Sequence, residues 1–204
     1  MAGRRLFVIA APSGAGKTSL VRELLVREPN LRVCVSHTTR ARRPTEIDGR
    51  DYHFVTVPQF EALLAGQEFL EHALVFNHYY GTSRTALTEA FGRGHDVILE
   101  IDWQGAAKVR LKMPDCIHIF ILPPTRNALA QRLRARGTDT DKEIQKRLIE
   151  AVSDITHYKE FDYVLINDVF TQAVADLQRI LECNAANLRP NRPELMPLLQ
   201  SLLA

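Results

Sequence analysis

The sequence predicts an α/β protein built around a parallel β-sheet. Short apolar runs rich in β-branched residues alternate with longer segments of helical periodicity, which is the order expected for strands connected by helices. A glycine-rich turn joins the first apolar run to the first helical segment. Two other segments depart from the alternation, one rich in Thr, Arg, Tyr and Gly and the other strongly charged. We therefore expect a three-layer α/β/α core with a small mixed β insert and a charged helical segment.

Four apolar runs are predicted to be strands of the central sheet: Leu6–Ala11, Val97–Ile101, Cys116–Leu122 and Tyr163–Ile166. Helices are predicted directly after the first strand, at Thr18–Arg27, and at the end of the alternation, at Phe170–Asn187. The segment from residue 34 to about residue 85 is interpreted as the mixed β insert. The charged segment Arg126–Tyr158 is interpreted as helical, with an interruption at residues 137–140.

Length and composition indicate one globular domain over all 204 residues, of which 46% are hydrophobic and 25% charged. The net charge of +2 produces no general positive field, so we expect no nucleic-acid partner. No run approaches the roughly 18 apolar residues of a membrane span, so we expect no membrane partner either. After residue 187 a proline-rich tail ends in several leucines. This tail is either a docked helix or a contact between copies in a homo-oligomer, and the sequence leaves both open.

The cysteines and the N-terminus both indicate a cytoplasmic protein. Cys34, Cys116 and Cys183 are odd in number, far apart and without Cys-x-x-Cys spacing, which argues against a disulfide framework and a zinc site. Two arginines before the run Leu6–Ala11 imitate the start of a signal peptide. However, the run is only six residues long and Pro12 ends it, so we interpret it as a buried strand.

The strongest motif is Ala11-Pro-Ser-Gly-Ala-Gly-Lys-Thr18, which lies between a predicted strand and a predicted helix. Its glycines allow the backbone to curl so that successive N–H groups face a phosphate at a helix N-terminus. Lys17 is expected to reach the β- and γ-phosphates, and the Thr18 hydroxyl to bind Mg²⁺. The predicted ATP-phosphate ligands are Ala11, Pro12, Ser13, Gly14, Ala15, Gly16, Lys17, Thr18 and Ser19.

This P-loop alone indicates a protein that uses a nucleoside triphosphate. It does not separate a kinase from a GTPase, an ATPase motor or a transporter subunit. Ala11 occupies the first position of the motif, where the consensus has Gly, but none of the groups that hold phosphate lies there.

The mixed insert carries the residues expected of an acceptor site. Three arginines lie within four residues at positions 40–43, with Tyr52 and Tyr80 further along. Guanidinium groups and tyrosine hydroxyls suit a phosphate dianion. A carboxylate such as Glu71 suits guanine, whose N1–H and N2–H₂ edge offers paired donors that adenine lacks. Each residue alone fits an exposed charged surface, but their combination after a P-loop favours a nucleotide acceptor.

The motifs Ser36-x-Thr-Thr-Arg-x-x-Arg, Gly49-x-Asp-Tyr-x-Phe, Phe69-Leu-Glu, Tyr79-Tyr-Gly-Thr and Ile101-Asp-Trp-Gln-Gly follow the P-loop in this order. Together they closely resemble guanylate kinases, from about residue 6 to residue 185. The resemblance implies transfer of the γ-phosphate of ATP to GMP, and also to dGMP, with Mg²⁺. It also implies a core of residues 1–36, 89–125 and 158–204, a GMP-binding lobe of residues 37–88 and a lid of residues 126–157.

Site residues follow from the same resemblance. It assigns guanine recognition to Ser36, Glu71, Thr82 and Asp102, and the GMP phosphate to Arg40, Arg43, Tyr52 and Tyr80. Its implied catalytic cations are Lys17, Arg43, Arg136 and Arg147, the last two from the lid. Thr82 keeps the hydroxyl of the Ser found in some relatives, and Arg42 and Thr45 stand where Pro and Gly are frequent.

Other assignments rest on the position of residues along the chain. Asn167 and Asp168 follow a predicted parallel strand, where ligands gather, so we expect them to contact ATP. Arg132, in the basic part of the lid, is assigned to ATP as well. Glu100 and Asp102 end an apolar strand, so either could lie in the second shell of Mg²⁺, although we favour guanine for Asp102.

The expected chemistry requires no general base, because the second pKa of a phosphate monoester is near 6 and the acceptor is largely a dianion at neutral pH. The sequence disfavours two other functions. A peptide-binding module of the same fold is disfavoured because Lys17 and Thr18 are intact. A kinase for another acceptor, such as a sugar phosphate, is disfavoured by the set Ser36, Glu71 and Asp102.

Overall fold

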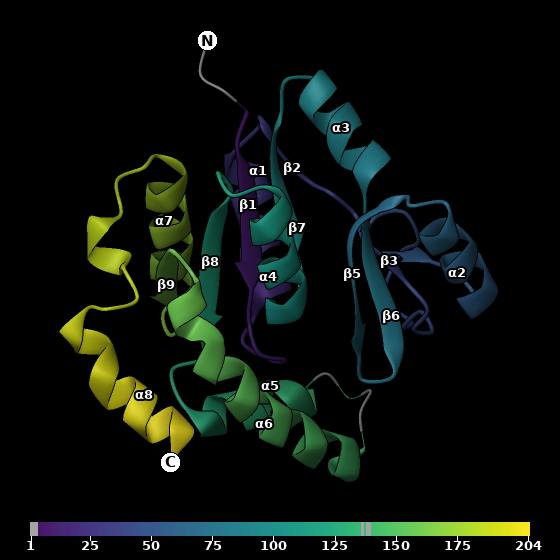
Figure 1. The fold of residues 1–204 in the computed structure, drawn as a ribbon. Coiled ribbons are helices and arrows are strands. Elements are labelled where there is room, and N and C mark those ends of the chain that lie inside the picture. The colour runs from purple at the N-terminus through teal and green to yellow at the C-terminus, as the bar shows by residue number, and fades with distance from the viewer. Residues whose placement is uncertain (1–3, 136, 138–139) are drawn as a thin grey trace. The chain divides into compact units, whose positions relative to one another are not determined.

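The computed structural model describes residues 4–135, 137 and 140–204. Figure 1 shows the helices and strands, coloured by residue number. The contacts between residues divide the chain into two compact units. The first unit contains the described part of Met1–Val8 together with Asn30–Cys116, and the second contains Ile9–Pro29 and Ile117–Ala204. The predicted GMP-binding lobe therefore falls within the first unit, and the described part of the predicted lid falls within the second.

The larger sheet has five strands in the order β2-β7-β1-β8-β9. Their bounds are β1 Leu6–Ala10, β2 Leu31–Val33, β7 Asp96–Glu100, β8 Ile117–Leu122 and β9 Tyr163–Ile166. The pairs β2·β7 and β8·β9 are parallel. All residues of β1 are buried, as its uninterrupted apolar run requires of a strand covered on both faces. The fold class and the four predicted strands are confirmed, whereas β2 is too short to produce a recognisable pattern.

The smaller sheet lies in the first unit and has four strands in the order β4-β3-β6-β5. Their bounds are β3 His37–Thr38, β4 His53–Phe54, β5 Phe69–Val75 and β6 His78–Ser83. It is mixed, as predicted, because β3 and β4 are parallel whereas β5 and β6 form an antiparallel hairpin. Phe76 and Asn77 close the hairpin with positive φ angles of 50° and 63°, as in a type I′ turn. Helix α2 (Val57–Ala65) begins with a capping box formed by Thr56 and Gln59.

Two more helices belong to the first unit. Helix α3 (Arg84–Gly92) begins after Ser83, whose hydroxyl accepts a hydrogen bond from the Ala86 N–H. Helix α4 (Trp103–Lys112) begins after Asp102, whose carboxylate accepts a hydrogen bond from the Gly105 N–H at 2.8 Å. Short polar residues at these positions satisfy N–H groups that the helix leaves unpaired.

The second unit carries the remaining helices: α1 Lys17–Arg27, α5 Arg126–Ala135, α6 Asp141–Thr156, α7 Phe170–Leu181 and α8 Met196–Leu203, with 3₁₀ turns η1 His157–Glu160, η2 Ala186–Leu188 and η3 Pro193–Leu195. The charged segment is therefore two helices, as predicted. Gly137, between them, has a φ of 64°, and Thr140 and Glu143 form a capping box at the start of α6. Residues 136, 138 and 139 lie outside the described residues.

Helix α7 is shorter than the predicted helix Phe170–Asn187. It ends at Leu181, because Cys183 adopts a left-handed φ of 58° and its N–H turns back to the Ile180 carbonyl. The tail that follows is folded onto its own unit: Leu195, Leu199 and Leu202 are buried, and α8 packs against α6. In the part of the chain that the structure describes, no helix has the length and apolar character needed to cross a membrane.

Candidate active site

The predicted phosphate cradle lies between β1 and α1 in the second unit. Gly14 and Gly16 both have φ angles of 93°, which glycine adopts without strain. A Cβ atom on Gly16 would lie only 2.3 Å from Nδ2 of Asn167, so no larger residue fits there. The turn is closed by a hydrogen bond from the Ala15 N–H to the Pro12 carbonyl at 3.1 Å.

The cradle is held from behind by two residues that the sequence assigned to ATP. The Asn167 side chain is buried and donates from Nδ2 to the Ala15 carbonyl at 2.7 Å. Arg132 donates to the same carbonyl at 3.1 Å and to the Asn167 carbonyl at 2.9 Å. Because a trans peptide directs its C=O and N–H in opposite directions, holding the Ala15 carbonyl fixes the direction of the Gly16 N–H. Asp168 is exposed beside this brace.

The cations of the second unit also approach the cradle. Arg147, on α6, donates to the hydroxyl of Ser13 at 3.2 Å. Lys17 is partly buried at the start of α1, and Thr18 and Ser19 are exposed in its first turn. The Thr18 hydroxyl is a hard oxygen ligand next to a phosphate cradle, which is a suitable donor for Mg²⁺. Arg136 lies outside the described residues.

Three of the four predicted base-reading residues, Glu71, Thr82 and Asp102, meet in the first unit around the buried Glu71 carboxylate. Glu71, on β5, is 3% exposed and accepts a hydrogen bond from the Thr82 hydroxyl at 2.6 Å. A Cβ atom on Gly105 would lie 2.7 Å from Oε2 of Glu71 and 3.1 Å from Oδ1 of Asp102. The absence of a side chain at Gly105 therefore allows Glu71 and Asp102 to approach each other. Ser36, just before β3, is also buried, but the contacts described for it do not reach Glu71.

The environment of Glu71 disfavours its charged form. Burial raises the pKa of Glu71 to about 7; the Thr82 hydrogen bond opposes this rise, and the negative charge of Asp102 adds to it. The nearby Cys34 thiol has its pKa raised to about 12, first by burial and then by the charge of Glu71. Cys34 is therefore protonated at neutral pH, whereas Glu71 gains or loses its proton close to neutral pH.

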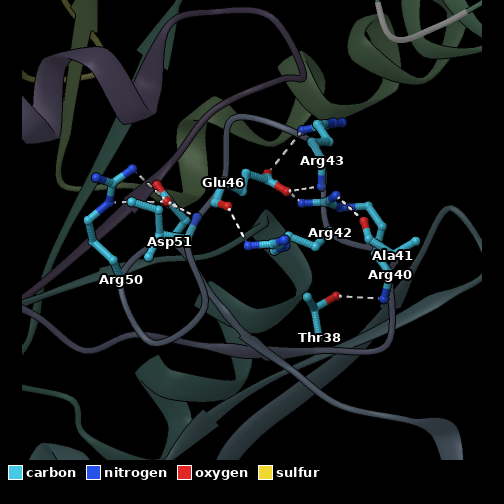
Figure 2. Close-up of polar contacts among 9 residues, drawn as sticks. Thr38, Arg40, Ala41, Arg42, Arg43, Glu46, Arg50 and Asp51 are labelled. Atoms are coloured by element: carbon cyan, nitrogen blue, oxygen red, sulfur yellow. Dashed lines mark hydrogen bonds and ion pairs between the residues drawn. The ribbon is translucent and has the colours of Figure 1, made fainter.

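The arginine cluster of the predicted acceptor site is organised by Glu46 (Figure 2). Its carboxylate accepts hydrogen bonds from the Arg40 side chain at 2.7 Å and from the Arg43 N–H at 2.8 Å, and lies 3.6 Å from the Arg43 guanidinium. Arg42 donates to the Glu46 carbonyl at 3.3 Å. Burial opposes ionisation of Glu46, but the hydrogen bonds from Arg40 and Arg43 outweigh it and lower its pKa. Glu46 thus holds an ionised carboxylate among arginines predicted to bind phosphate.

Two tyrosines complete this side of the lobe. The rings of Tyr52 and Tyr80 have centroids 5.9 Å apart, and the Arg40 guanidinium lies over the Tyr52 ring at 5.5 Å. Burial raises the pKa of Tyr52, and negative charge at Tyr80 and Glu100 raises it further. Tyr52 is therefore a neutral hydrogen-bonding group at physiological pH. Glu100, predicted as a neighbour of Mg²⁺, is close enough to Tyr52 to act on it electrostatically.

A match to known proteins agrees with this arrangement. The profile of the guanylate kinase family matches residues 3–184. The chain belongs to the guanylate kinase family. It is 52% identical to the guanylate kinase of Alkalilimnicola ehrlichii over 198 residues, which cover 97% of this chain and 98% of that one. It is 50% identical to the guanylate kinase of Pseudomonas fluorescens, with 97% and 96% covered.

A solved structure extends the comparison to three dimensions. The crystal structure of guanylate kinase from Anaplasma phagocytophilum superposes with a TM-score of 0.73 at 31% identity, covering 98% of this chain and 96% of that one. Membership of the guanylate kinase family is therefore supported both by sequence over nearly the whole chain and by fold.

Sequence reasoning missed several residues of these sites. Glu46 was not singled out, although an acidic residue three positions after Arg43 was a usable signal. Gly105 lies within the motif Ile-Asp-Trp-Gln-Gly, but its purpose is visible only once Glu71 is placed against α4. Arg132 and Asn167 were assigned to ATP, but their hydrogen bonds to the Ala15 carbonyl were not predicted. Each bond joins residues more than 100 positions apart in the sequence, so no local pattern indicates it.

Proposed function

We propose that this guanylate kinase transfers the γ-phosphate of ATP to GMP, giving ADP and GDP, and that dGMP is accepted as well. The observation that carries the choice of GMP is the buried Glu71 carboxylate with the Thr82 hydroxyl and Asp102 beside it. A carboxylate can accept hydrogen bonds from both N1–H and N2–H₂ of guanine. Adenine has an unprotonated N1 at that edge. With AMP bound, this N1 and the Glu71 carboxylate would both be hydrogen-bond acceptors, and the buried carboxylate would be left unpaired.

The donor nucleotide is proposed to bind in the second unit. The backbone N–H groups of residues 11–19 surround the phosphates, and the Lys17 ammonium neutralises charge on the β- and γ-oxygens. Thr18 would hold Mg²⁺, which supplies further charge neutralisation at the phosphates. Arg132 and Asn167 shape the cradle through the Ala15 carbonyl, and Asn167 and Asp168 are proposed to lie near the adenosine.

The acceptor nucleotide is proposed to bind in the first unit. Ser36, Glu71, Thr82 and Asp102 would contact guanine, and Arg40, Arg43, Tyr52 and Tyr80 would hold the phosphate. Glu46 supports this assignment, because its carboxylate already orders Arg40 and Arg43 as partners for an anion. Glu100 is proposed to lie in the second shell of Mg²⁺, and it is also close enough to Tyr52 to act on its pKa.

The chemistry is proposed to be an in-line transfer without a general base. The GMP phosphate is largely a dianion at neutral pH, so its oxygen attacks without losing a proton to the protein. The transition state is loose, and catalysis consists mostly of positioning and of neutralising charge on the transferring group. Lys17, Arg43 and the lid residues Arg136 and Arg147 are proposed to supply that charge, and the contact of Arg147 with Ser13 supports its place.

The proposed division into core, GMP-binding lobe and lid follows from these roles. Residues 37–88 carry most of the acceptor contacts, and residues 126–157 carry the cations expected to close on the phosphates. The remainder, residues 1–36, 89–125 and 158–204, would form the core. This division is functional, and its boundaries differ from those of the two compact units.

A coupled assay of ADP release tests the proposal directly. The protein is supplied with ATP and Mg²⁺, and GMP, dGMP, AMP and ribose 5-phosphate are compared as acceptors. We expect turnover with GMP and dGMP, and kcat/KM for AMP lower by a factor of about 10⁴, the scale reached by sites that bind a base edge through hydrogen bonds. Equal use of AMP, or turnover with ribose 5-phosphate alone, would contradict the assignment.

A further inference from the structure

Strand β5, which carries Glu71, is the outermost strand of the smaller sheet. One edge of the strand pairs with β6, and the register shifts between Phe69 and Glu71, which marks a bulge beside the carboxylate. The carbonyls of Leu70 and His72, on either side of Glu71, both accept hydrogen bonds from outside the sheet. An outer edge of this kind needs hydrogen-bond partners from elsewhere.

Helix α4 supplies these partners. Lys112 donates from Nζ to the Leu70 carbonyl, and Lys108 donates from Nζ to the His72 carbonyl. The two lysines therefore bind the backbone immediately before and immediately after Glu71. Gly105, Lys108 and Lys112 are spaced by three and four residues, so they share one face of α4, which packs against β5.

The same helix face controls the charge around Glu71. The groups that act on its carboxylate are the Thr82 hydroxyl from β6, Asp102 directly before α4, and Lys108 and Lys112 on α4. Burial and Asp102 raise the pKa of Glu71, whereas Thr82, Lys108 and Lys112 lower it. The lysines thus favour the ionised carboxylate, which is the form that can accept both hydrogen bonds from guanine.

We propose that Lys108 and Lys112 are positioning residues for guanine recognition, which hold the outer edge of β5 on both sides of Glu71 and fix its carboxylate against α4. This inference rests on the proposed function, because it assigns these lysines a part in reading the base of GMP. Neither lysine needs to touch GMP. Their effect passes through the backbone of β5 and through the electrostatic field at Glu71.

Substitution of both lysines provides the test. In the variant Lys108→Met/Lys112→Met we expect KM for GMP to rise about 10-fold at pH 7, as for the loss of two partly exposed charge-assisted contacts. The pH at which kcat/KM for GMP is half-maximal should move upward relative to the wild-type protein, because the carboxylate loses two neighbouring cations. KM for ATP should remain within about twofold of the wild-type value, since the cradle lies in the other unit.

Matched variants separate hydrogen bonding, charge and folding. Lys108→Arg/Lys112→Arg keeps both donors and both charges and should restore KM for GMP. Lys108→Gln/Lys112→Gln keeps donors without charge, so it should retain the upward pH displacement with a smaller rise in KM. Lys159→Met removes one lysine from the second unit and should leave both quantities unchanged. Circular dichroism and the melting temperature report on folding, and the Gln variant gives the answer if the Met variant does not fold.

The outcomes are distinct. If the folded Met or Gln variants keep the wild-type KM for GMP and the wild-type pH midpoint, the two lysines are only surface charges and the inference is wrong. If kcat/KM for GMP and for AMP fall by the same factor without a pH displacement, the lysines stabilise the fold and do not position Glu71. If the wild-type protein itself does not phosphorylate GMP, the proposed function fails before the variants are compared.

Discussion

The substitution Glu71→Gln is expected to have opposite effects on activity and on stability. It preserves size and the acceptor for the Thr82 hydroxyl, but it removes the charge and leaves one acceptor oxygen in place of two. Loss of one charged hydrogen-bond pair costs about 2–3 kcal/mol, so kcat/KM for GMP should fall roughly 30- to 150-fold at pH 8. AMP, which does not use the carboxylate as a partner, should lose little.

The pH dependence of this loss follows from the raised pKa. Because the pKa of Glu71 is about 7, the wild-type carboxyl is mostly protonated at pH 6 and mostly ionised at pH 8. Only about a tenth of the molecules carry the ionised form at pH 6, so the ratio of wild-type to variant kcat/KM should shrink about 10-fold between pH 8 and pH 6. Taking this ratio at each pH cancels the titration of GMP itself.

The stability effect has the opposite sign. In the folded protein the pKa of Glu71 is raised from 4.5 to about 7, so the folded state binds the proton more tightly than the unfolded state. The protonated Glu71 carboxyl therefore stabilises the folded protein. This stabilisation is fully present below pH 4.5 and is lost as the pH rises through about 7. Gln carries no charge to bury, so at pH 8 the variant should be more stable than the wild-type protein by roughly 3 kcal/mol at most. At pH 4.5 this difference should disappear.

The measurements are kcat/KM for GMP and AMP in the coupled assay between pH 6 and pH 8, and urea denaturation at pH 4.5 and pH 8. Glu61→Gln, an exposed position on α2, is the matched control and should change neither quantity. If kcat/KM for GMP and AMP fall together, or if the loss for GMP is the same at pH 6 and pH 8, Glu71 does not read the base as an ionised carboxylate.

Three further predictions concern the second unit. Lys17→Ala should lower turnover by about 10³-fold or more with an unchanged circular dichroism spectrum, because it removes the cation proposed to follow charge on the phosphates; near-normal steady-state turnover would contradict the cradle assignment. Arg147→Ala should lower kcat far more than it raises KM for GMP, because its guanidinium is expected to engage mainly in the transition state; a change confined to KM in initial-rate kinetics would make it a binding residue. Asn167→Ala should raise KM for ATP about 10-fold and destabilise the protein by about 1–3 kcal/mol in urea denaturation, because the Ala15 carbonyl loses a buried donor; an unchanged KM for ATP would show that Arg132 alone holds the cradle.

Local patterns in the sequence were sufficient to predict many of the strands and helices of this protein. The buried strand β1, the glycines of the cradle and the helix α1 that follows are specified by neighbouring residues, because hydrophobic period and turn chemistry act over short distances. The composition of the insert and of the charged segment was enough to predict a mixed sheet and a helical segment, and the order of the motifs was enough to predict the family. The predicted C-terminus of α7, Asn187, lies six residues beyond the observed one, Leu181. The helical pattern of the sequence does not indicate that Cys183 adopts a left-handed conformation.

The tertiary structure alone decided how side chains distant in sequence act on one another. Glu71 is a plausible surface carboxylate when β5 is read by itself, and it becomes a buried acceptor only because Gly105 allows α4 to approach it. Asn167 has the position of a ligand at a strand end, yet its amide is directed to the Ala15 carbonyl, 152 positions away in the chain. Burial and hydrogen-bond partners are set by packing between elements, and packing is a long-range property that hydrophobic period and motif spacing do not encode.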